Sequence, residues 1–491
     1  MSVKAKKKKL KKVGIFFAIL LVLSLVTFDI FLLYTDILPL KYLIIYLSVS
    51  TLLVFLFTRV LLLRKFKIWI KCVVMFLSLI FILIFTIGCI YINKTYDFLG
   101  KISSRGEMTE KYYVMINTNS NYDNIKDLEG KVVGSFNENV EIYNEAIKKY
   151  NKKVSSELKE YDSVNGMVND LLDNNIDAII LSGTHKETID MDVPTFKDNT
   201  KVIYTIEIKN KNLVKIKKAD LDVTKKPFTI YISGIDSYGD ILSRSRSDVN
   251  MLATINPKTH EILLVSIPRD YYVQLHGISG GYDKLTHAGF FGVDMSINTI
   301  QDFMGINIDS YIKVNFSTLI GIVDTIGGVD VYSDAAFIPW TNQKIYINKG
   351  NIHMNGEMAL AFARERHAYI EGDRHRVQNQ QDVLIAIVKK MTSSTALLRK
   401  YTELLDKMSS SFETNIQPDD ITSLIKHQLD KMPSWTIKSY NVNGFDDSKY
   451  TYSYGSQELY VMQPDQTTID IAKGYINGMK EGKTFAELGI E

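Results

Sequence analysis

Charged residues stand at the ends of apolar segments in the second half of the chain. The segment FTIYISGID, residues 228–236, alternates apolar and small residues as a half-buried strand does, and it ends in Asp236. Asp248 precedes the apolar run VNMLATI, and Arg269 follows the apolar run EILLVSI. Charges at strand ends contribute little to core packing, so we expect them to converge on a ligand at the edge of a sheet. Two carboxylates beside an arginine indicate a divalent cation with an anionic ligand, because magnesium combines one or two carboxylates with substrate phosphate oxygens.

A second group of charged residues occurs in the segment 359–391. Arg364 and Arg366 are two positions apart, so both side chains point the same way if the chain is extended there. Asp373 and Arg376 follow within one helical turn of each other. Arginine offers a planar fork that binds phosphate through two hydrogen bonds. An isolated Arg-x-Arg pair is typical of a solvated surface, but together with the strand-end charges it predicts an anion site.

The elements that must position these residues indicate an α/β fold. Two strands, VNMLATI and EILLVSI, are joined by a turn with the sequence NPKTH, and an apolar helix follows near Val383. That helix and the buried strands could line an apolar cavity. Residues 323–333 are expected to form a strand with a turn at Gly327–Gly328. We expect further helices over residues 402–408, 419–429 and 467–479, which complete the outer layer.

A separate α/β segment precedes this region. Residues 111–220 alternate strand-like and helix-like patterns, in an order that resembles one lobe of an extracellular solute-binding protein. One lobe without its partner lacks the cleft that would hold a ligand, so a spacer or protein-contact domain is the favoured interpretation. The lysine-rich residues 209–227 are the expected linker. We expect strands over residues 112–117, 131–136 and 176–183, and helices over residues 139–150 and 163–174, the second opened by Ser163.

The first 92 residues predict a membrane anchor. Three apolar segments, residues 13–34, 42–63 and 68–92, each have the length of about 20 residues that crosses a bilayer. Lysine and arginine concentrate in residues 1–12 and in the second connection, so these parts are expected in the cytoplasm and everything after residue 92 outside. The two cysteines, Cys72 and Cys89, both lie in an apolar segment, which excludes a disulfide framework and a cysteine zinc site.

The motifs of the second half occur in the order found in the LytR–CpsA–Psr family, which this sequence resembles over about 160 residues. The three spans and the extra domain further resemble the capsule-locus branch of that family. The motifs that carry the resemblance are GID (234–236), SRSD (245–248), INPKT to SIPRD (255–270), KLTHA (284–288), VDTIGGVDV (323–331), ARER (363–366) and GDRHRVQNQQ (372–381).

The resemblance implies a mixed α/β/α sandwich as the catalytic domain, over residues 228–485, after a small α/β accessory domain over residues 100–220. It implies a multi-pass membrane protein of the Gram-positive cell envelope, with its catalytic part extracytoplasmic. The implied activity is a phosphotransferase that moves capsular polysaccharide or another anionic glycan from a polyprenyl-pyrophosphate carrier to peptidoglycan. Mg²⁺ is the implied cofactor, with Mn²⁺ as an alternative, and the capsule synthesis machinery is a candidate partner.

The resemblance also assigns roles to residues. Asp236 and Asp248 would hold the metal, and Asp248 and Asp373 are both candidates for the base that accepts the acceptor's proton. The common family pattern has arginine where this chain has Asn379, which leaves the preferred donor open. The pyrophosphate and lipid would contact Arg246, Arg269, Arg364, Arg366, Arg376 and Gln380, and catalysis would involve Asp248, Arg269, Arg364, Arg366, Asp373 and Arg376.

Three other functions are alternatives to transfer. A transcriptional regulator needs a cytoplasmic DNA-reading helix, and only about 12 residues and a short loop are expected there, so no nucleic-acid partner is predicted. A non-catalytic scaffold or regulator of capsule synthesis would not need the aspartates and arginines together. Hydrolysis of the polyprenyl pyrophosphate would use the same site with water as acceptor, and the sequence does not separate it from transfer.

Overall fold

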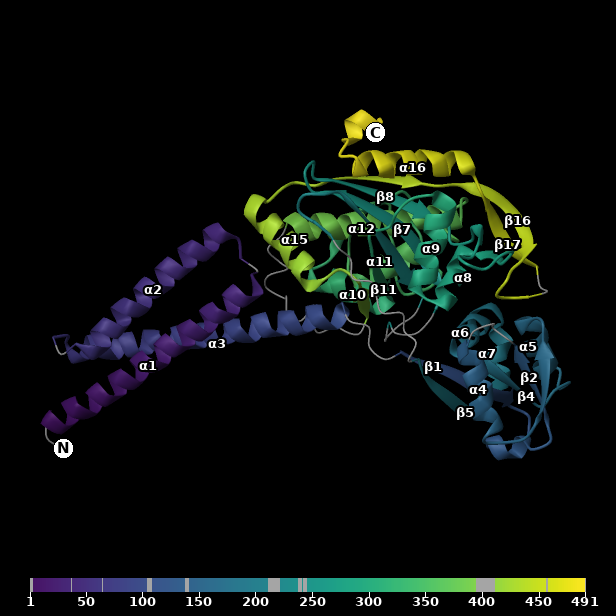
Figure 1. Cartoon of the computed structure of the whole chain (residues 1–491), viewed down its shortest axis with the longest axis horizontal. Helices are drawn as coiled ribbons and strands as arrows, with labels where there is room; N and C mark the ends of the chain where they lie inside the picture. Colours follow the sequence, from purple (N-terminus) through teal and green to yellow (C-terminus); the bar gives the residue numbers. More distant parts are fainter. Residues whose placement is uncertain are drawn as a thin grey trace.

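The computed structural model describes residues 3–36, 38–63, 65–103, 108–136, 141–210, 221–236, 241, 245–393, 411–455 and 458–490. The helix predicted over residues 402–408 and most of the predicted linker lie outside these residues. Three long helices, a small α/β domain and a larger α/β domain follow one another along the chain (Figure 1). The predicted fold class is confirmed.

The three helices have the length and composition that a membrane requires. They are α1 (Val3–Thr35), α2 (Leu40–Leu62) and α3 (Ile68–Ile102). Apolar side chains, including Leu21, Leu25 and Phe85, pack between them. α3 is longer than predicted because its helix continues beyond the apolar segment through polar residues such as Lys94 and Lys101.

Both ends of the anchor have distinct surroundings. The N-terminus and the connection between α2 and α3 lie at the end remote from the other domains (Figure 1). The connection between α1 and α2 lies beside the large domain, where Lys41 pairs with Asp430 at 2.9 Å and Asp36 pairs with Lys426 at 2.7 Å. The last turns of α3 also pack on the large domain, through the side chains of Phe98, Leu99 and Ile102 against Ile322, Phe412 and Ile421.

The small domain is a five-stranded sheet in the order β3-β2-β4-β1-β5, with apolar cores on both faces. Its predicted elements are present, and the Ser163 hydroxyl caps α5 by accepting from the Gly166 amide. β3, β5, α6 and α7 were not predicted, because polar residues dominate them. The elements are β1 (Met108–Asn117), β2 (Val132–Phe136), α4 (Glu141–Asn151), β3 (Glu157–Tyr161), α5 (Val164–Leu172), β4 (Ala178–Ser182), α6 (Gly183–Asp192), α7 (Pro194–Asn199) and β5 (Thr200–Asn210), with a short 3₁₀ helix at Ile125–Leu128.

The large domain is built on a six-stranded mixed sheet in the order β14-β11-β6-β7-β8-β15. β7 pairs antiparallel with both β6 and β8, as the predicted turn between β7 and β8 requires. β11 runs parallel to β6, and β15 runs parallel to β8. The strands are β6 (Phe228–Ile235), β7 (Ser247–Asn256), β8 (Glu261–Ile267), β11 (Ser310–Asn315), β14 (Phe412–Thr414) and β15 (Thr436–Asn441).

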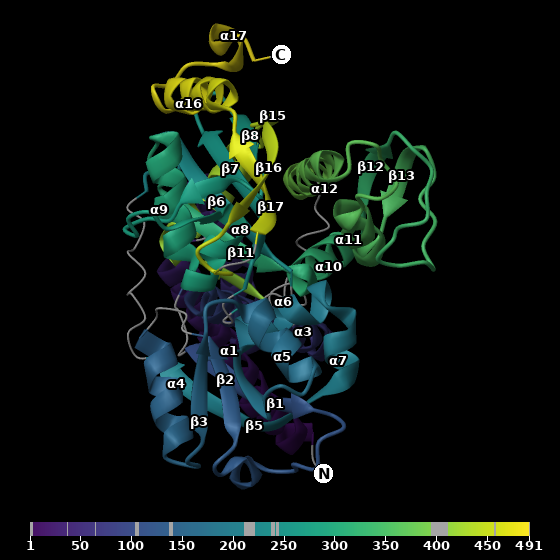
Figure 2. The ribbon, with the colours of Figure 1, turned by 90° about the vertical axis from the view of Figure 1, so that its right-hand side faces the viewer.

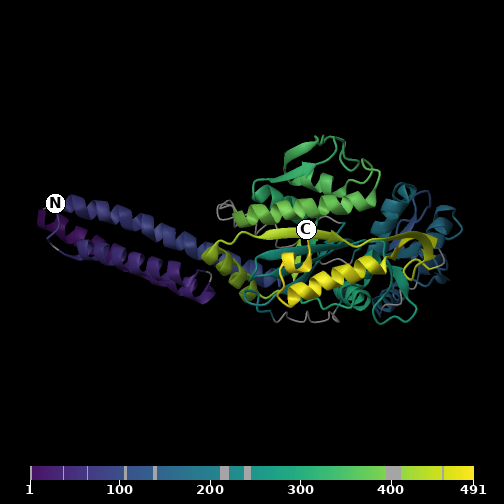
Figure 3. The same ribbon diagram turned by 90° about the horizontal axis from the view of Figure 1, so that it is seen from above.

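Helices cover both faces of this sheet, which makes three layers (Figure 3). Side chains of successive residues in each strand point to opposite faces of the sheet. Tyr231 and Leu252 therefore pack on one side, and Ile230 and Met251 pack on the other. The first side is covered by α9 (Val293–Met304) and α16 (Gln466–Lys480), and the second by α12 (Asp373–Ser393) and α15 (Pro418–Lys431).

A lobe projects from one side of the large domain (Figure 2). It contains α10 (Phe316–Thr325), the hairpin of β12 (Val329–Ser333) and β13 (Gly350–Met354), and α11 (Gly356–Arg364), packed on α12 around one apolar core. The prediction of a strand over residues 323–333 was wrong in its first part, because residues 323–325 end α10. The predicted turn is present, and Gly327 and Gly328 have φ of 83° and 86°, which favours glycine.

The remaining elements lie at the domain's ends. The predicted helices over 419–429 and 467–479 are α15 and α16, whereas the strands between them were not predicted.

His185 of the small domain contacts Phe290 and Tyr454 of the large domain, with ring centroids 5.5 and 6.1 Å apart. The elements not yet named are β9 (Tyr272–Gln274), β10 (Tyr282–Lys284), α8 (Leu285–Ala288), the 3₁₀ helix Gly289–Phe291, β16 (Gly444–Tyr450), β17 (Glu458–Pro464) and α17 (Phe485–Leu488).

Candidate active site

A cavity of about 570 Å³ opens between the sheet and the lobe. Its charged wall comes from the ends of β6 and β8, the start of β7, the end of α11 and the first turns of α12. Eight of the nine residues predicted for the site line it, although they come from widely separated parts of the sequence. These eight are Asp236, Arg246, Asp248, Arg269, Arg364, Arg366, Arg376 and Gln380.

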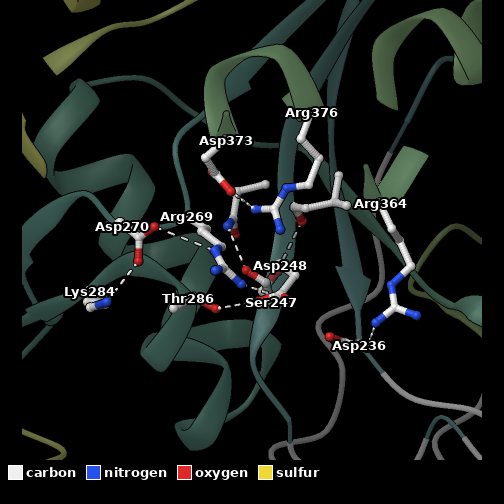
Figure 4. A network of polar contacts seen from close by, with 12 residues as sticks. Asp236, Ser247, Asp248, Arg269, Asp270, Lys284, Thr286, Arg364, Asp373 and Arg376 are labelled. Carbon is white, nitrogen blue, oxygen red and sulfur yellow. Dashed lines mark hydrogen bonds and ion pairs between the residues drawn. The ribbon is translucent and has the colours of Figure 1, made fainter. Parts of the chain in front are cut away.

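Asp248 and Arg269 form the centre of the charged wall (Figure 4). Arg269 Nη1 donates to Asp248 Oδ2 at 3.0 Å, and the Thr286 hydroxyl donates to the other carboxylate oxygen at 3.2 Å. Asp248 is the second residue of β7, and Arg269 follows β8, which pairs antiparallel with it. An antiparallel pair brings the start of one strand beside the end of the next, which explains why residues 21 positions apart meet here.

Arg269 is also held from its other side. Its Nε lies 3.5 Å from the carboxylate of Asp270, which in turn accepts from Lys284 Nζ at 3.0 Å. All these side chains are largely buried. Burial raises the pKa of Asp270, but the charges of Arg269 and Lys284 outweigh it and hold that pKa below its ordinary value. Asp270 and Lys284 were not predicted for the site, although they lie in the motifs SIPRD and KLTHA.

Asp236 lies at the end of β6, on the lobe side of the cavity. Its carboxylate is 3.4 Å from Arg364 Nη2, across the opening between sheet and lobe (Figure 4). The Arg364 guanidinium also lies 4.2 Å from the centre of the Phe316 ring, which is a cation–π distance. Arg364 is the last residue of α11, and Glu365 after it is extended, so the chain turns here.

The two aspartates have opposite pKa shifts. Burial and the charge of Asp248 raise the pKa of Asp236, although Arg364 acts against this. Burial also acts to raise the pKa of Asp248, but the charges of Arg269, Arg246 and Arg376 outweigh it and hold that pKa below its ordinary value. Both carboxylates line the same cavity, which is why the charge of Asp248 acts on Asp236.

Arg376 and Asp373 form a pair at the start of α12. Arg376 lines the cavity, and its Nη2 is 2.7 Å from Asp373 Oδ1. Asp373 is the one predicted site residue that does not line the cavity, so it acts on the cavity through Arg376. Burial and the charge of Arg269 lower the pKa of Arg376. In the part of the chain that the structure describes, the buried Arg376 Nε has no hydrogen-bond partner, which leaves a donor for an anion.

Asn379 stands where the common family pattern has arginine, and its position in the structure explains why it is not a ligand of the cavity. Asn379 is 1% exposed, and its side-chain amide donates to the Phe362 carbonyl oxygen at 3.1 Å. The side chain therefore joins α12 to α11 and does not line the cavity. Gln380, the next residue, does line it.

The opposite end of the cavity is apolar. It is lined by side chains from the sheet, α10, α11 and α12, and one cavity thus combines a strongly cationic end with an apolar end. The predicted contribution of the helix near Val383 is present. The apolar residues include Ile232, Met251, Val314, Leu319, Leu360, Val383, Leu384 and Ile387.

The charged wall fits a magnesium ion that binds together with a substrate. Asp236 and Asp248, at adjoining ends of the neighbouring strands β6 and β7, would provide two hard oxygen ligands, and no group of three His, Cys, Asp or Glu side chains suited to a metal occurs among the described residues. Magnesium typically uses one or two carboxylates and completes its shell with water and phosphate oxygens. His287 and His375 have structural surroundings: one bonds Asp283 at 2.6 Å, and the other stacks on Tyr369.

Comparison with known proteins identifies the family. The model of the LytR_cpsA_psr family matches residues 193–469, which is more than half of the chain. The chain belongs to this family, as its motifs predicted. The match begins in the last part of the small domain and ends within α16.

Named relatives share this region. The polyisoprenyl-teichoic acid–peptidoglycan teichoic acid transferase TagU of Bacillus anthracis is 38% identical over 206 residues, which are 42% of this chain and 66% of that protein. The enzyme of the same description named TagV, from Bacillus subtilis strain 168, is 32% identical over 256 residues, or 51% of this chain and 64% of that protein. This chain thus spans slightly less than two thirds of either relative.

Solved structures also align with it. The crystal structure of B. subtilis TagV is 30% identical with a TM-score of 0.45, covering 53% of this chain and 99% of that chain. The structure of TagT bound to LIIa-WTA is 28% identical with a TM-score of 0.44, covering 54% of this chain and 94% of that chain.

Proposed function

We propose that this protein is a membrane-anchored phosphotransferase that moves a glycan, with its sugar phosphate, from a polyprenyl-pyrophosphate carrier to peptidoglycan. The glycan would be capsular polysaccharide or another anionic polymer. The observation that carries the proposal is the single cavity with a cationic end and an apolar end, because a lipid pyrophosphate needs both. Membership of a family whose named relatives transfer teichoic acid to peptidoglycan supports the same reaction.

The residues of the charged wall have distinct tasks in this proposal. Magnesium, held by Asp236 and Asp248, would neutralise phosphate charge when bound. Arg364 and Arg366 approach from the lobe, and Arg269 and Arg376 from the sheet side, so the pyrophosphate lies between two sets of guanidinium groups. Phosphoryl transfer is accelerated mainly by positioning and by stabilising charge on the transferred and leaving phosphates.

The proton of the acceptor hydroxyl needs an acceptor near the phosphates. Of the two candidates, Asp248 lines the cavity, whereas Asp373 lies outside its lining and binds Arg376. Of the two, Asp248 is the one placed to accept the proton, as a weak base because its arginine partners lower its pKa, and Asp373 orients Arg376. The Thr286 hydroxyl and Arg269 fix the Asp248 carboxylate in place.

The proposed location is the outer face of the cell membrane. The basic N-terminus and the basic connection between α2 and α3 lie at one end of the helices. The small domain and the large domain both lie at the other end (Figure 1). This arrangement supports a cytoplasmic basic end and an extracytoplasmic site. The donor's lipid would then enter from the leaflet next to the large domain.

The test uses the full-length protein in detergent, a polyprenyl-pyrophosphate-linked glycan and a peptidoglycan oligosaccharide as acceptor. We expect glycan phosphate on the acceptor, and loss of most turnover with excess chelator or in Asp236→Asn and Asp248→Asn. Losing a ligand that stabilises transition-state charge should reduce the rate about 100-fold or more. Asp470→Asn, an exposed carboxylate on α16, is the control and should keep full activity.

Two results would contradict parts of the proposal. Full turnover in excess chelator would refute the proposed role of the metal in the reaction. Release of glycan phosphate to water, with the acceptor unmodified over a range of acceptor concentrations, would identify the protein as a hydrolase.

A further inference from the structure

A tryptophan stands at the rim of the cavity with most of its side chain in solvent. Trp340 is 66% exposed, yet it lines the cavity together with Thr341 and His367. Its ring is tilted against the His367 ring, with centroids 4.9 Å apart. A large aromatic surface that remains exposed beside a binding cavity is more typical of a contact surface than of a core.

The chain holds this aromatic pair firmly through one buried carboxylate. Glu365 is 1% exposed and lies between the two arginines of the lobe. Its Oε2 accepts from the Trp340 amide at 2.6 Å, and its Oε1 accepts from the amides of Arg366, His367 and Ala368 at 3.0, 2.6 and 3.0 Å. One side chain therefore fixes both halves of the pair and the backbone of Arg366.

The loop that carries Trp340 is also closed at its base. Phe337 and Ile347 exchange backbone hydrogen bonds of 3.0 and 2.9 Å. The Phe337 side chain is buried and contacts the rings of Phe362 and Tyr369. A rim residue held by buried contacts on both sides loses little freedom on binding, which favours its use as a binding surface.

The position of the pair indicates what it contacts. Arg366 Nε donates to His367 Nε2 at 3.3 Å, so the aromatic pair is one side chain away from a proposed phosphate ligand. The lipid is accommodated by the apolar end of the cavity, which different residues line. The group bonded to the phosphate on its other side is a sugar, whose ring C–H groups form an apolar face that packs on an aromatic ring.

We propose that Trp340 and His367 form a subsite for a pyranose ring next to the pyrophosphate. This rests on the proposed function and extends it to the sugar. The tryptophan ring packs on the apolar face of the sugar, while the Thr341 hydroxyl and the His367 ring are polar groups at the same rim for its hydroxyls. The sugar belongs either to the donor, directly bonded to the phosphate, or to the acceptor.

The experiment compares two probes on the full-length protein in detergent. One is undecaprenyl pyrophosphate without a sugar, and the other is undecaprenyl pyrophosphate bearing one N-acetylhexosamine; calorimetry gives the dissociation constants. We expect Trp340→Ala to weaken binding of the sugar-bearing probe about tenfold, which corresponds to about 1.4 kcal/mol, and to leave the sugar-free probe unchanged. Trp340→Phe should restore most of the affinity, because it keeps an aromatic face.

The control is Tyr332→Ala. Tyr332 is 57% exposed on β12 of the same lobe but does not line the cavity, so both probes should bind as they do to the unsubstituted chain. The melting temperature of each variant shows whether the lobe remains folded.

The outcomes separate the two proposals. If Trp340→Ala leaves both donor probes unchanged but raises the KM for a peptidoglycan oligosaccharide about tenfold in the transfer assay, the sugar belongs to the acceptor. If neither the donor affinity nor the acceptor KM changes, the sugar subsite is refuted and the proposed function stands. If neither probe binds the unsubstituted chain, the proposed function fails and this inference fails with it.

Discussion

Individual side chains at this site differ in how firmly they are held before any ligand arrives. Arg269 lies between Asp248 and Asp270, and these charges raise its pKa above the ordinary value. Arg364 is 30% exposed with one longer ion pair, 3.4 Å from Asp236, and Arg366 is exposed. Charges that are already paired define the shape of the wall, whereas the exposed ones remain available to a ligand.

Replacing the lobe arginines with lysine tests this distinction. Arg364→Lys and Arg366→Lys keep the charge but lose the planar fork, so we expect a rate loss of about 30- to 1000-fold, or about 2–4 kcal/mol, in the transfer assay. Arg374→Lys is the control, because that side chain is 53% exposed and does not line the cavity. A tenfold change in rate corresponds to about 1.4 kcal/mol. If both lobe variants keep a rate within about twofold of the unsubstituted protein, neither guanidinium binds the phosphates.

The charged residues of the site could be predicted from the sequence because charged side chains are unusual directly beside apolar strands. Trp340 could not, since nothing near it in sequence marks the rim of a cavity. The role of Glu365 was equally hidden: it stands between two arginines and reads as their surface ion-pair partner. Asp373 was grouped with the site by its spacing and by the family resemblance, and the structure adds its ion pair with Arg376.

At the scale of elements, α8 and its neighbours place Thr286 against the site. The next residue, His287, is 3% exposed, bonds Asp283, and stacks between the rings of Phe290 and Tyr454, each with a centroid 5.0 Å away. Burial lowers the pKa of His287 from its ordinary value near 6.5, although Asp283 acts in the opposite direction. The unfolded chain therefore binds this proton more readily than the folded one.

This predicts a loss of stability on acidification. As pH falls through 6.5, the unfolded state gains the proton first, so the free energy of unfolding should decrease by up to about 1.4 kcal/mol per pH unit. Melting temperatures at pH 7.5 and 5.5 measure this loss of stability. His287→Asn should reduce the acid-dependent change, whereas His276→Asn, an exposed histidine on the same domain, should not. Equal acid sensitivity in all three proteins would contradict the assignment.

Elements with a strong apolar period were predicted well, and polar ones were not. The three long helices, β6, β7, β8 and α16 follow clear patterns. β15 and β16 carry mostly exposed or partly exposed side chains, so their strand character comes from pairing, of β15 with the distant β8 and of β16 with β17, which follows it. The error at residues 323–325 has a similar cause: a short apolar run before two glycines fits a strand and a helix end equally.

For the whole molecule, the arrangement of the helices predicts the orientation in the membrane. In a chain with Cys72→Ser and Cys89→Ser, a cysteine in place of Lys449, which is 45% exposed on the large domain, should react with a membrane-impermeant thiol reagent in intact cells. A cysteine in place of Lys65, between α2 and α3, should react only after the membrane is opened. The reverse pattern would contradict the proposed location and, with it, access to an extracytoplasmic acceptor.

The uninterrupted course of α3 bears on which lipids can serve as donors. The helix continues about ten residues, or roughly 15 Å, past its apolar segment, and it ends packed on α10, whose Leu319 lines the cavity. With α3 in a bilayer, the cavity stands at a constant height above the surface. Under the proposed function, a polyprenyl donor would then have to withdraw a fixed length of its chain from the leaflet to present its phosphates, while the rest stays among the acyl chains. Carriers of different total length would therefore reach the arginines at the same cost.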